Sequence, residues 1–202
     1  MRSDGAVAPQ ALKTLAGRLQ LGLCLVVLLP LAAPWGAGAL AWRFEPWNAE
    51  EWWRALSGGW VHADARHACL NSAALAVLAC LGQGRASLLL GLALAAPPLI
   101  AVMQWLWPTP QAFVGASGLV YCWWAALALT QPRWRGLWLA ALLARLVWQS
   151  LFPGNWSGGE PVLTSAHWSG AVLGMLAACG WLRRAQLLTT RGTLGATAHI
   201  SS

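Results

Sequence analysis

The sequence predicts an all-α polytopic membrane protein with six transmembrane helices. Of its 202 residues, 58% are hydrophobic and only 9% are charged, whereas an ordinary soluble domain carries roughly 25% charged residues. The apolar residues form long segments, and most of the charged residues stand in the short stretches between them. A chain of this composition is expected in a lipid bilayer.

Six segments have the composition of membrane spans, which need roughly 20 mostly apolar residues. The first is too long for the apolar core of a secretion signal, roughly 7 to 15 residues, so we expect it to be retained. Pro97 and Pro98 predict a kink or break in the third span, because each lacks a backbone donor. The spans are expected at residues 19–41, 67–82, 87–107, 113–130, 134–152 and 163–182.

Basic residues predict the orientation of these spans. Lys and Arg are enriched on the cytoplasmic side of membrane proteins, and one set of span ends carries more of them than the other. The richer set comprises Lys13, Arg18, Arg85, Arg133, Arg135, Arg183 and Arg184, and the poorer set comprises Arg43, Arg54 and Arg66. We therefore expect a cytoplasmic lead over 1–18, a membrane domain over 19–182 and a cytoplasmic tail over 183–202. Spans two, four and six then begin at the external face.

Composition and spacing argue against several classes of protein. The net charge of +7 comes from single basic residues without a patch or motif, so no nucleic-acid partner is expected. The five cysteines lack metal-ligand spacing and no His-Glu-x-x-His motif occurs, so we expect neither a metal nor a cofactor. No Asp or Glu falls within the six spans, which argues against aspartyl intramembrane proteases and common proton-relay transporters.

A serine near the start of the fourth span is the candidate nucleophile. Ser117 lies between Gly115 and Gly118, and glycine leaves room for another backbone to approach. A serine hydroxyl is a poor nucleophile on its own, so this interpretation requires a base and donors for an oxyanion.

The candidate base is His167, near the start of the sixth span. Gly170 and Gly174 follow it at spacings of three and four, so the three residues share one helix face. Small residues on such a face let membrane helices approach closely. If the fourth span is the partner, Ser117 and His167 come within hydrogen-bond reach. The alternative is a structural seam of small residues with an incidental histidine.

Two residues of the second span are candidate oxyanion donors. His67 and Asn71 are four residues apart at the external end of that span, so they point the same way. Together with the backbone N–H of Ser117 they could stabilise an oxyanion. The alternative role for the pair is helix capping or hydrogen bonding between helices.

Three further residues complete the polar set. Tyr121 lies four residues after Ser117, so its ring is expected either to orient His167 or to fill the helix interface. His62 is expected near the mouth of a cavity. Arg145 is the one charge deep in a span, and we expect it to turn toward the cytoplasmic side or to find carbonyl partners, without a catalytic role.

Four motifs, in the same order and topology, resemble those of the rhomboid intramembrane serine proteases. The resemblance covers roughly residues 52–181. The motifs are Gly115-Ala116-Ser117-Gly118 with Tyr121, Ala166-His167-Trp168-Ser169-Gly170 with Gly174, the pattern of His62, His67 and Asn71, and the pair Trp53-Arg54.

The resemblance implies a six-helix rhomboid-like bundle and a serine endopeptidase with a Ser117–His167 dyad and no third acid. It also implies an oxyanion site of Asn71, His67 and the Ser117 amide, in a water-filled cavity open to the outside. The implied substrates are membrane-anchored proteins that are cut in or near a transmembrane segment. The compact core is similar to the bacterial rhombosortase branch, whose exported substrates end in a Gly-Gly, apolar and basic tail. That branch implies the bacterial inner membrane, with the site facing the periplasm.

Two other functions stay open from the sequence. A catalytically inactive rhomboid-like protein that binds membrane clients would share the fold, although the presence of both Ser117 and His167 favours the enzyme. A small transporter or channel is disfavoured, because the polar residues cluster at one depth instead of lining a path through the membrane.

Overall fold

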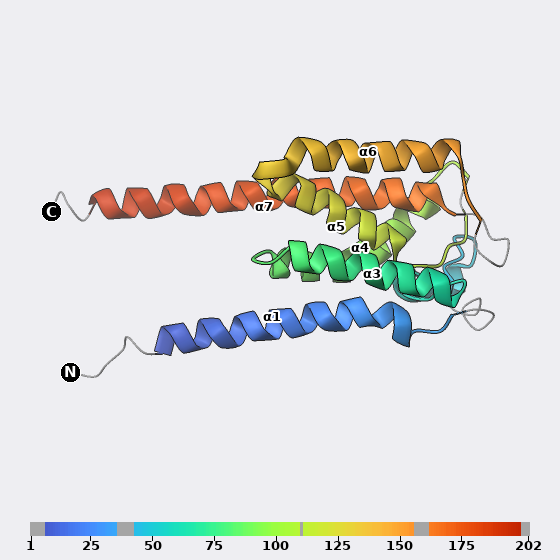
Figure 1. Cartoon of the computed structure of the whole chain (residues 1–202), viewed down its shortest axis with the longest axis horizontal. Helices are drawn as coiled ribbons and strands as arrows, with labels where there is room; N and C mark the ends of the chain where they lie inside the picture. Colours follow the sequence, from blue (N-terminus) through green and yellow to red (C-terminus); the bar gives the residue numbers. More distant parts are fainter. Residues whose placement is uncertain (1–6, 36–42, 110, 156–161, 199–202) are drawn as a thin grey trace.

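Helices make up the fold. The structure is a computed structural model that describes residues 7–35, 43–109, 111–155 and 162–198, and within these ranges no strand occurs. The long helices lie side by side, and the start of α1 and the end of α7 are at the same end of the molecule (Figure 1). They are α1 (Val7–Ala32), α3 (Ala65–Leu81), α4 (Ala86–Trp105), α5 (Ser117–Thr130), α6 (Arg135–Leu151) and α7 (Thr164–Ala198). The short helices are η2 (Ala49–Glu51), α2 (Arg54–Ser57) and η3 (Pro132–Trp134).

One long helix corresponds to each expected span, although the ends of several helices differ from the expected ones. The first helix stops at Ala32, and residues 36–41 of the expected span lie outside the described residues. The fourth begins at Ser117 instead of residue 113, and the last continues to Ala198 instead of ending near 182. Helix α4 runs through Pro97 without a break, and so does not bear out the alternative of a broken span.

Among the described residues, two helices are long and apolar enough to cross a membrane. Lys13–Ala32 and Ala86–Trp105 satisfy both criteria, whereas α3 and α5 are apolar but have only 17 and 14 residues. In α1 only 11% of the apolar window is buried, so most of this helix presents apolar side chains outward, as a lipid-facing helix does. The count of six spans remains a prediction.

Helix α5 lies at the centre of the bundle. Its residues Cys122, Trp123 and Ala125 are fully buried, and the Trp123 indole N–H donates to the Leu89 carbonyl of α4 at 3.0 Å. The most extensive helix interface in the described part is that between α5 and α7. A central helix surrounded on several sides is fixed in position, so a residue at its start is held firmly.

The α5–α7 interface depends on two glycines of α7. A Cβ atom at Gly170 would overlap the Gly118 carbonyl of α5, and one at Gly174 would overlap the Cys122 carbonyl. The two backbones therefore approach with no side chain between them at these positions, which is the packing that small residues permit in membranes. The sequence prediction that Gly170 and Gly174 face a neighbouring helix agrees with this contact.

The loop of residues 43–64, called the first loop below, fixes where α5 begins. Phe44 and Phe113 exchange two backbone hydrogen bonds of 3.1 Å, and the Gly115 N–H donates to the Gly58 carbonyl at 2.9 Å. The Ala116 N–H donates to the His62 imidazole at 3.2 Å. Residues 113–116 are thus paired with the first loop, and this pairing explains why the helix starts at residue 117.

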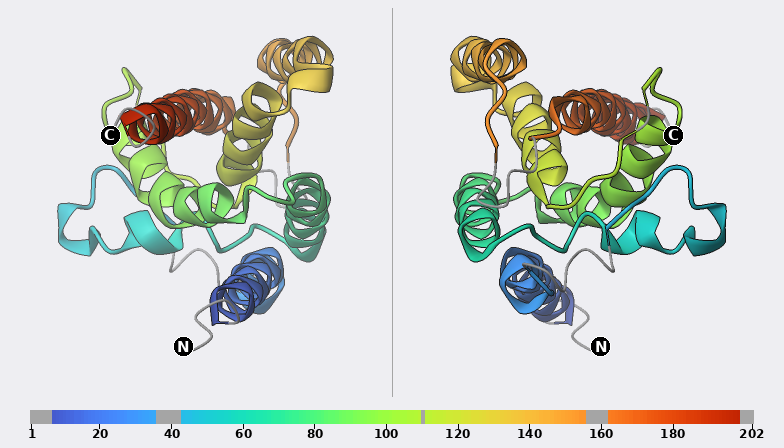
Figure 2. Two further views of the ribbon diagram at one scale, coloured as in Figure 1. Left: turned by 90° about the vertical axis from the view of Figure 1, so that its left-hand side faces the viewer. Right: turned by 90° about the vertical axis from the view of Figure 1, so that its right-hand side faces the viewer.

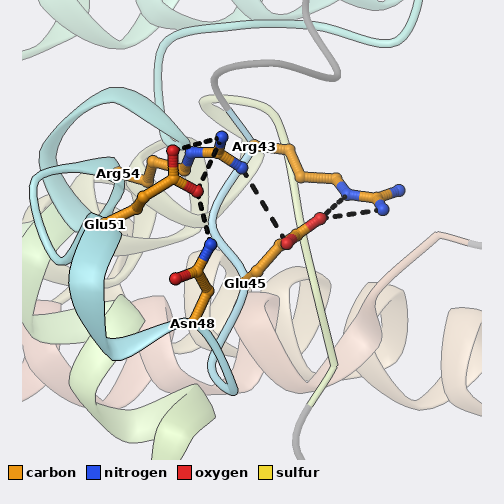
Figure 3. Close-up of polar contacts among 5 residues, drawn as sticks. All are labelled: Arg43, Glu45, Asn48, Glu51 and Arg54. Carbon is orange, nitrogen blue, oxygen red and sulfur yellow. Dashed lines mark hydrogen bonds and ion pairs between the residues drawn. The ribbon is translucent and has the colours of Figure 1, made fainter.

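An ion-pair cluster holds the first loop together (Figure 3). Arg43 pairs with Glu45 at 2.9 Å, Arg54 pairs with Glu51 at 2.8 Å and reaches Glu45 at 3.9 Å, and Asn48 contacts Glu51. Two arginines thereby neutralise two glutamates, which suits a loop that packs beside apolar helices. Figure 2 shows this loop beside α4, on the side of the bundle away from α6.

Replacing Gly174 tests the helix contact. The added methyl group of Gly174→Ala meets backbone atoms that cannot move aside, so we expect a loss of about 1 to 3 kcal/mol in the free energy of unfolding. Thermal unfolding of the purified protein in detergent measures this loss of stability. The control is Gly180→Ala on the same helix, where a Cβ meets nothing within 4 Å. Equal melting temperatures for the two variants would contradict the proposed contact.

Candidate active site

Ser117 is the first residue of α5, and Gly115 shapes the turn before it. Gly115 has a φ of +111°, in the region that favours glycine. A Cβ atom there would also come within 2.5 Å of the His67 ring. Glycine at this position therefore serves both the backbone turn and the close packing of α3 on the turn.

The Ser117 hydroxyl meets the His167 imidazole. Ser117 Oγ lies 2.8 Å from His167 Nε2, and His167 is only 4% exposed. The backbone contact of Gly118 with Gly170, one and three residues further along their helices, brings the two side chains to this distance. His167 Nδ1 has no hydrogen-bond partner among the described residues, so no carboxylate orients the ring from behind.

An aromatic ring takes the orienting position. Tyr121 stacks on His167 with ring centres 4.5 Å apart and an angle of 23° between the planes, and Trp124 stacks on Tyr121 at 6.2 Å. The Tyr121 hydroxyl donates to Gln149 Oε1 of α6 at 2.9 Å. The imidazole is thus held by a ring that is itself anchored to another helix.

His67 and Asn71 line the other side of the turn at Gly115. They are 1% and 6% exposed, and an atom built at the Gly115 Cβ position would lie 2.7 Å from His67 Nε2 and 3.6 Å from Asn71 Nδ2. Asn71 Nδ2 has no hydrogen-bond partner in the described part of the chain. The Ser117 amide, as the first of its helix, has no acceptor within α5. These groups are placed to donate to an anion beside Ser117.

His62 lies buried beneath the turn that precedes Ser117, and not near the mouth of a cavity as expected from the sequence. It is fully buried, its Nε2 accepts the Ala116 N–H, and its ring meets that of His67 edge to face at 4.8 Å. Burial, reinforced by the nearby His67, lowers the pKa of His62 to about 3. The imidazole is therefore neutral near pH 7, and its Nε2 stays an acceptor for the turn that precedes Ser117.

A second polar cluster supports the start of α7. Gln104 is fully buried, donates to Ser169 Oγ at 3.1 Å and accepts from Ser165 Oγ at 2.6 Å. The Trp168 indole donates to Ser150 of α6 at 3.0 Å. A cavity of about 310 Å³, lined in part by Ser150, Ser165 and Trp168, lies beside this cluster and offers water a route to it.

Sequence reasoning misses Gln104 and Gln149. Each is an uncharged polar residue in an otherwise apolar helix, and that pattern is the one signal that could have singled them out. Their partners come from other helices and cannot be read from the sequence.

The expectation that Arg145 turns toward the cytoplasmic side or finds carbonyl partners stays a prediction. Its guanidinium lies within reach of the Tyr121 hydroxyl, which Gln149, four residues further along α6, also binds. The Arg145 side chain is itself exposed. Among the described residues, no group of three or more His, Cys, Asp or Glu side chains could hold a metal ion.

Comparison with known proteins agrees with the resemblance noted in the sequence. Residues 49–184 match the rhomboid domain family, while no curated protein matches the chain. The matched segment contains Ser117, His167, His67 and Asn71 and covers well over half of the 202 residues. Rhomboid proteins lie in membranes, are generally serine proteases and act on membrane protein substrates. This integral membrane protein therefore belongs to the rhomboid family.

Proposed function

We propose that this protein is an intramembrane serine endopeptidase that cuts membrane-anchored proteins in or near a transmembrane segment. The observation that carries the proposal is the 2.8 Å distance between Ser117 Oγ and His167 Nε2, in a buried site of a rhomboid domain. A hydroxyl and an imidazole at this distance form the nucleophile and base of a serine hydrolase.

The reaction follows from the positions of these groups. Ser117 Oγ attacks the scissile carbonyl carbon while His167 Nε2 takes the hydroxyl proton, giving a tetrahedral intermediate. His167 then returns this proton to the leaving amine, the C–N bond breaks, and an acyl ester remains on Ser117. Water then attacks the ester carbon while His167 takes a proton from it. His167 returns this proton to Ser117 Oγ as the ester C–O bond breaks, which releases the second product and restores the Ser117 hydroxyl.

Donors beside Ser117 stabilise the negative oxygen of both tetrahedral intermediates. The Asn71 amide, the His67 imidazole and the Ser117 N–H are the proposed donors. Each is held in place before reaction by a helix or by the turn at Gly115, so little reorganisation is needed. Tyr121 keeps the imidazole oriented, a task that a carboxylate performs in Ser-His-Asp enzymes.

The proposed membrane topology has six spans with both termini in the cytoplasm. In this arrangement residues 1–18 are a cytoplasmic lead, 19–182 the membrane domain and 183–202 a cytoplasmic tail, of which 199–202 lie outside the described residues. The dyad then opens to the external side, where substrate helices end and unwind most readily. We further propose a rhombosortase role in a bacterial inner membrane, with substrates anchored by a C-terminal Gly-Gly, apolar and basic tail.

Ser117→Ala tests the nucleophile. We expect cleavage of a transmembrane substrate in proteoliposomes to fall by at least about 10⁴-fold, because no other group can form the acyl ester. Product bands and mass spectrometry measure the rate, and thermal unfolding checks that the fold is retained. Ser87→Ala, at the exposed start of α4, is the matched control. If wild type and Ser117→Ala bind the substrate equally and neither cuts it, the protein is an inactive client binder.

Asn71→Ala tests the oxyanion site. We expect kcat to fall by about 10²- to 10³-fold with little change in KM, because the lost amide acts on the intermediate and not on the bound substrate. Steady-state kinetics on the same substrate separate the two constants. Ser72→Ala, the next residue on α3 and also buried, should leave kcat near the wild-type value. A change confined to KM would argue for a binding role instead.

Two variants of Tyr121 separate its ring from its hydroxyl. Tyr121→Phe keeps the stack on His167 and loses the hydrogen bond to Gln149, whereas Tyr121→Leu removes the ring. We expect a larger fall in kcat for Tyr121→Leu, since ring stacking orients the base. Equal effects on kcat would show that the hydroxyl, and not the ring, controls His167.

A further inference from the structure

Arg145 carries a positive charge in an otherwise apolar part of α6 without an acidic partner in the described chain. None of the ion pairs among the described residues includes it, and the acidic residues of that part all stand in the first loop. A charge within a membrane helix is costly and is usually paired or turned to a wet cavity. Because Arg145 is exposed, it is open to a counter-ion from outside the described residues.

The position of Arg145 connects it with the proposed dyad. The guanidinium is within reach of the Tyr121 hydroxyl, and the Tyr121 ring stacks on His167 at 4.5 Å. Gln149, one helical turn after Arg145 on the same face of α6, accepts from the Tyr121 hydroxyl at 2.9 Å. Any anion bound at Arg145 would therefore lie next to the groups that are proposed to cut the substrate.

An apolar cavity lies against the same face of α6. It measures about 580 Å³ and lies between α3, α5 and α6, with Val77, Trp124 and Ala141 among its lining residues. Arg145 follows Ala141 by four residues and so stands on the same face of α6, one turn closer to the dyad. An apolar segment in this cavity could carry an anionic group to Arg145.

Electrostatics gives such an anion a catalytic consequence. His167 becomes positively charged when it takes the Ser117 proton, and a second positive charge nearby opposes that step, most strongly in a site of low dielectric constant. A carboxylate paired with Arg145 would cancel this repulsion. An anionic group would thus speed the reaction as well as anchor its carrier.

We propose that Arg145 binds an acidic side chain of the substrate, an Asp or Glu close to the scissile bond, and that the protein cuts such substrates in preference to neutral ones. The inference rests on the proposed protease function. Arg145 lies six residues before the end of α6, or about 9 Å along the helix. A peptide segment in the site brings a carboxylate to that depth, whereas a lipid phosphate remains near the membrane surface.

The test uses pairs of transmembrane substrates. The two members of a pair differ only at one position, which is Asp in one and Asn in the other. Each pair places this position at a different residue around the scissile bond. Wild-type protein and Arg145→Gln are compared in phosphatidylcholine vesicles. At the best position we expect wild type to cut the Asp substrate about tenfold faster in kcat/KM, because a hydrogen bond to a charged group is worth at least that factor. The Arg145→Gln ratio should fall to about one. Arg135→Gln, at the far end of α6, should keep the wild-type ratio.

The other outcomes are distinguishable. Equal Asp-to-Asn ratios in wild type and Arg145→Gln would overturn this inference and leave the protease function standing. If wild type cuts neither substrate, the protease function itself fails. If cleavage rates rise when phosphatidylglycerol is added to the vesicles and are the same for the Asp and Asn substrates, a lipid headgroup is the counter-ion and the inference is overturned. If Arg145→Gln does not fold, Arg145→Lys is tested instead and must retain part of the preference for the Asp substrate. A substrate with Lys at the same position must also be the one that wild type cuts most slowly. Failure of either result overturns the inference.

Discussion

The backbone contact between α5 and α7 is the constraint on which the candidate site depends. Gly170 and Gly174 let the two helices meet at the carbonyls of Gly118 and Cys122. In a bilayer, apolar side chains gain little by leaving lipid, so helix association relies on such close packing. A larger residue at either glycine would move α7 outward, and His167 would then lose its 2.8 Å contact with Ser117.

A second constraint fixes where Ser117 lies along the bundle and the direction from which the chain enters α5. The first loop binds residues 113–116 through Phe44, Gly58 and His62, so the chain cannot continue α5 backward beyond Ser117. The positive φ of Gly115 then turns the chain past His67. Because the loop is braced by the Arg43–Glu45 and Arg54–Glu51 pairs (Figure 3), residues far from the dyad help to hold its geometry.

The parts of the site that follow from local periodicity could be predicted, and those that depend on tertiary partners could not. Spacings of three and four place His167 with its two glycines, and a spacing of four places His67 with Asn71, whatever the rest of the chain does. The start of α5 depends instead on the first loop, and the place of Gln149 beside Tyr121 depends on how α6 packs on α5. The number of spans stays a prediction, since α3 and α5 are shorter than the bilayer core and their burial in the bundle decides how they sit.

The polar groups around the proposed dyad are all neutral or basic, and this shapes what the site can do. Gln149 and Tyr121 fix the imidazole without adding a negative charge, whereas a buried carboxylate at the same position would stabilise the imidazolium at all times. Arg145, one helical turn before Gln149 on α6, adds a positive charge to these surroundings. If the proposed substrate carboxylate pairs with this arginine, the charge is cancelled only when the correct segment is bound, which would limit cutting of unrelated helices. No acidic side chain occurs among the described residues of α3 to α7, so in this proposal the substrate supplies the negative charge.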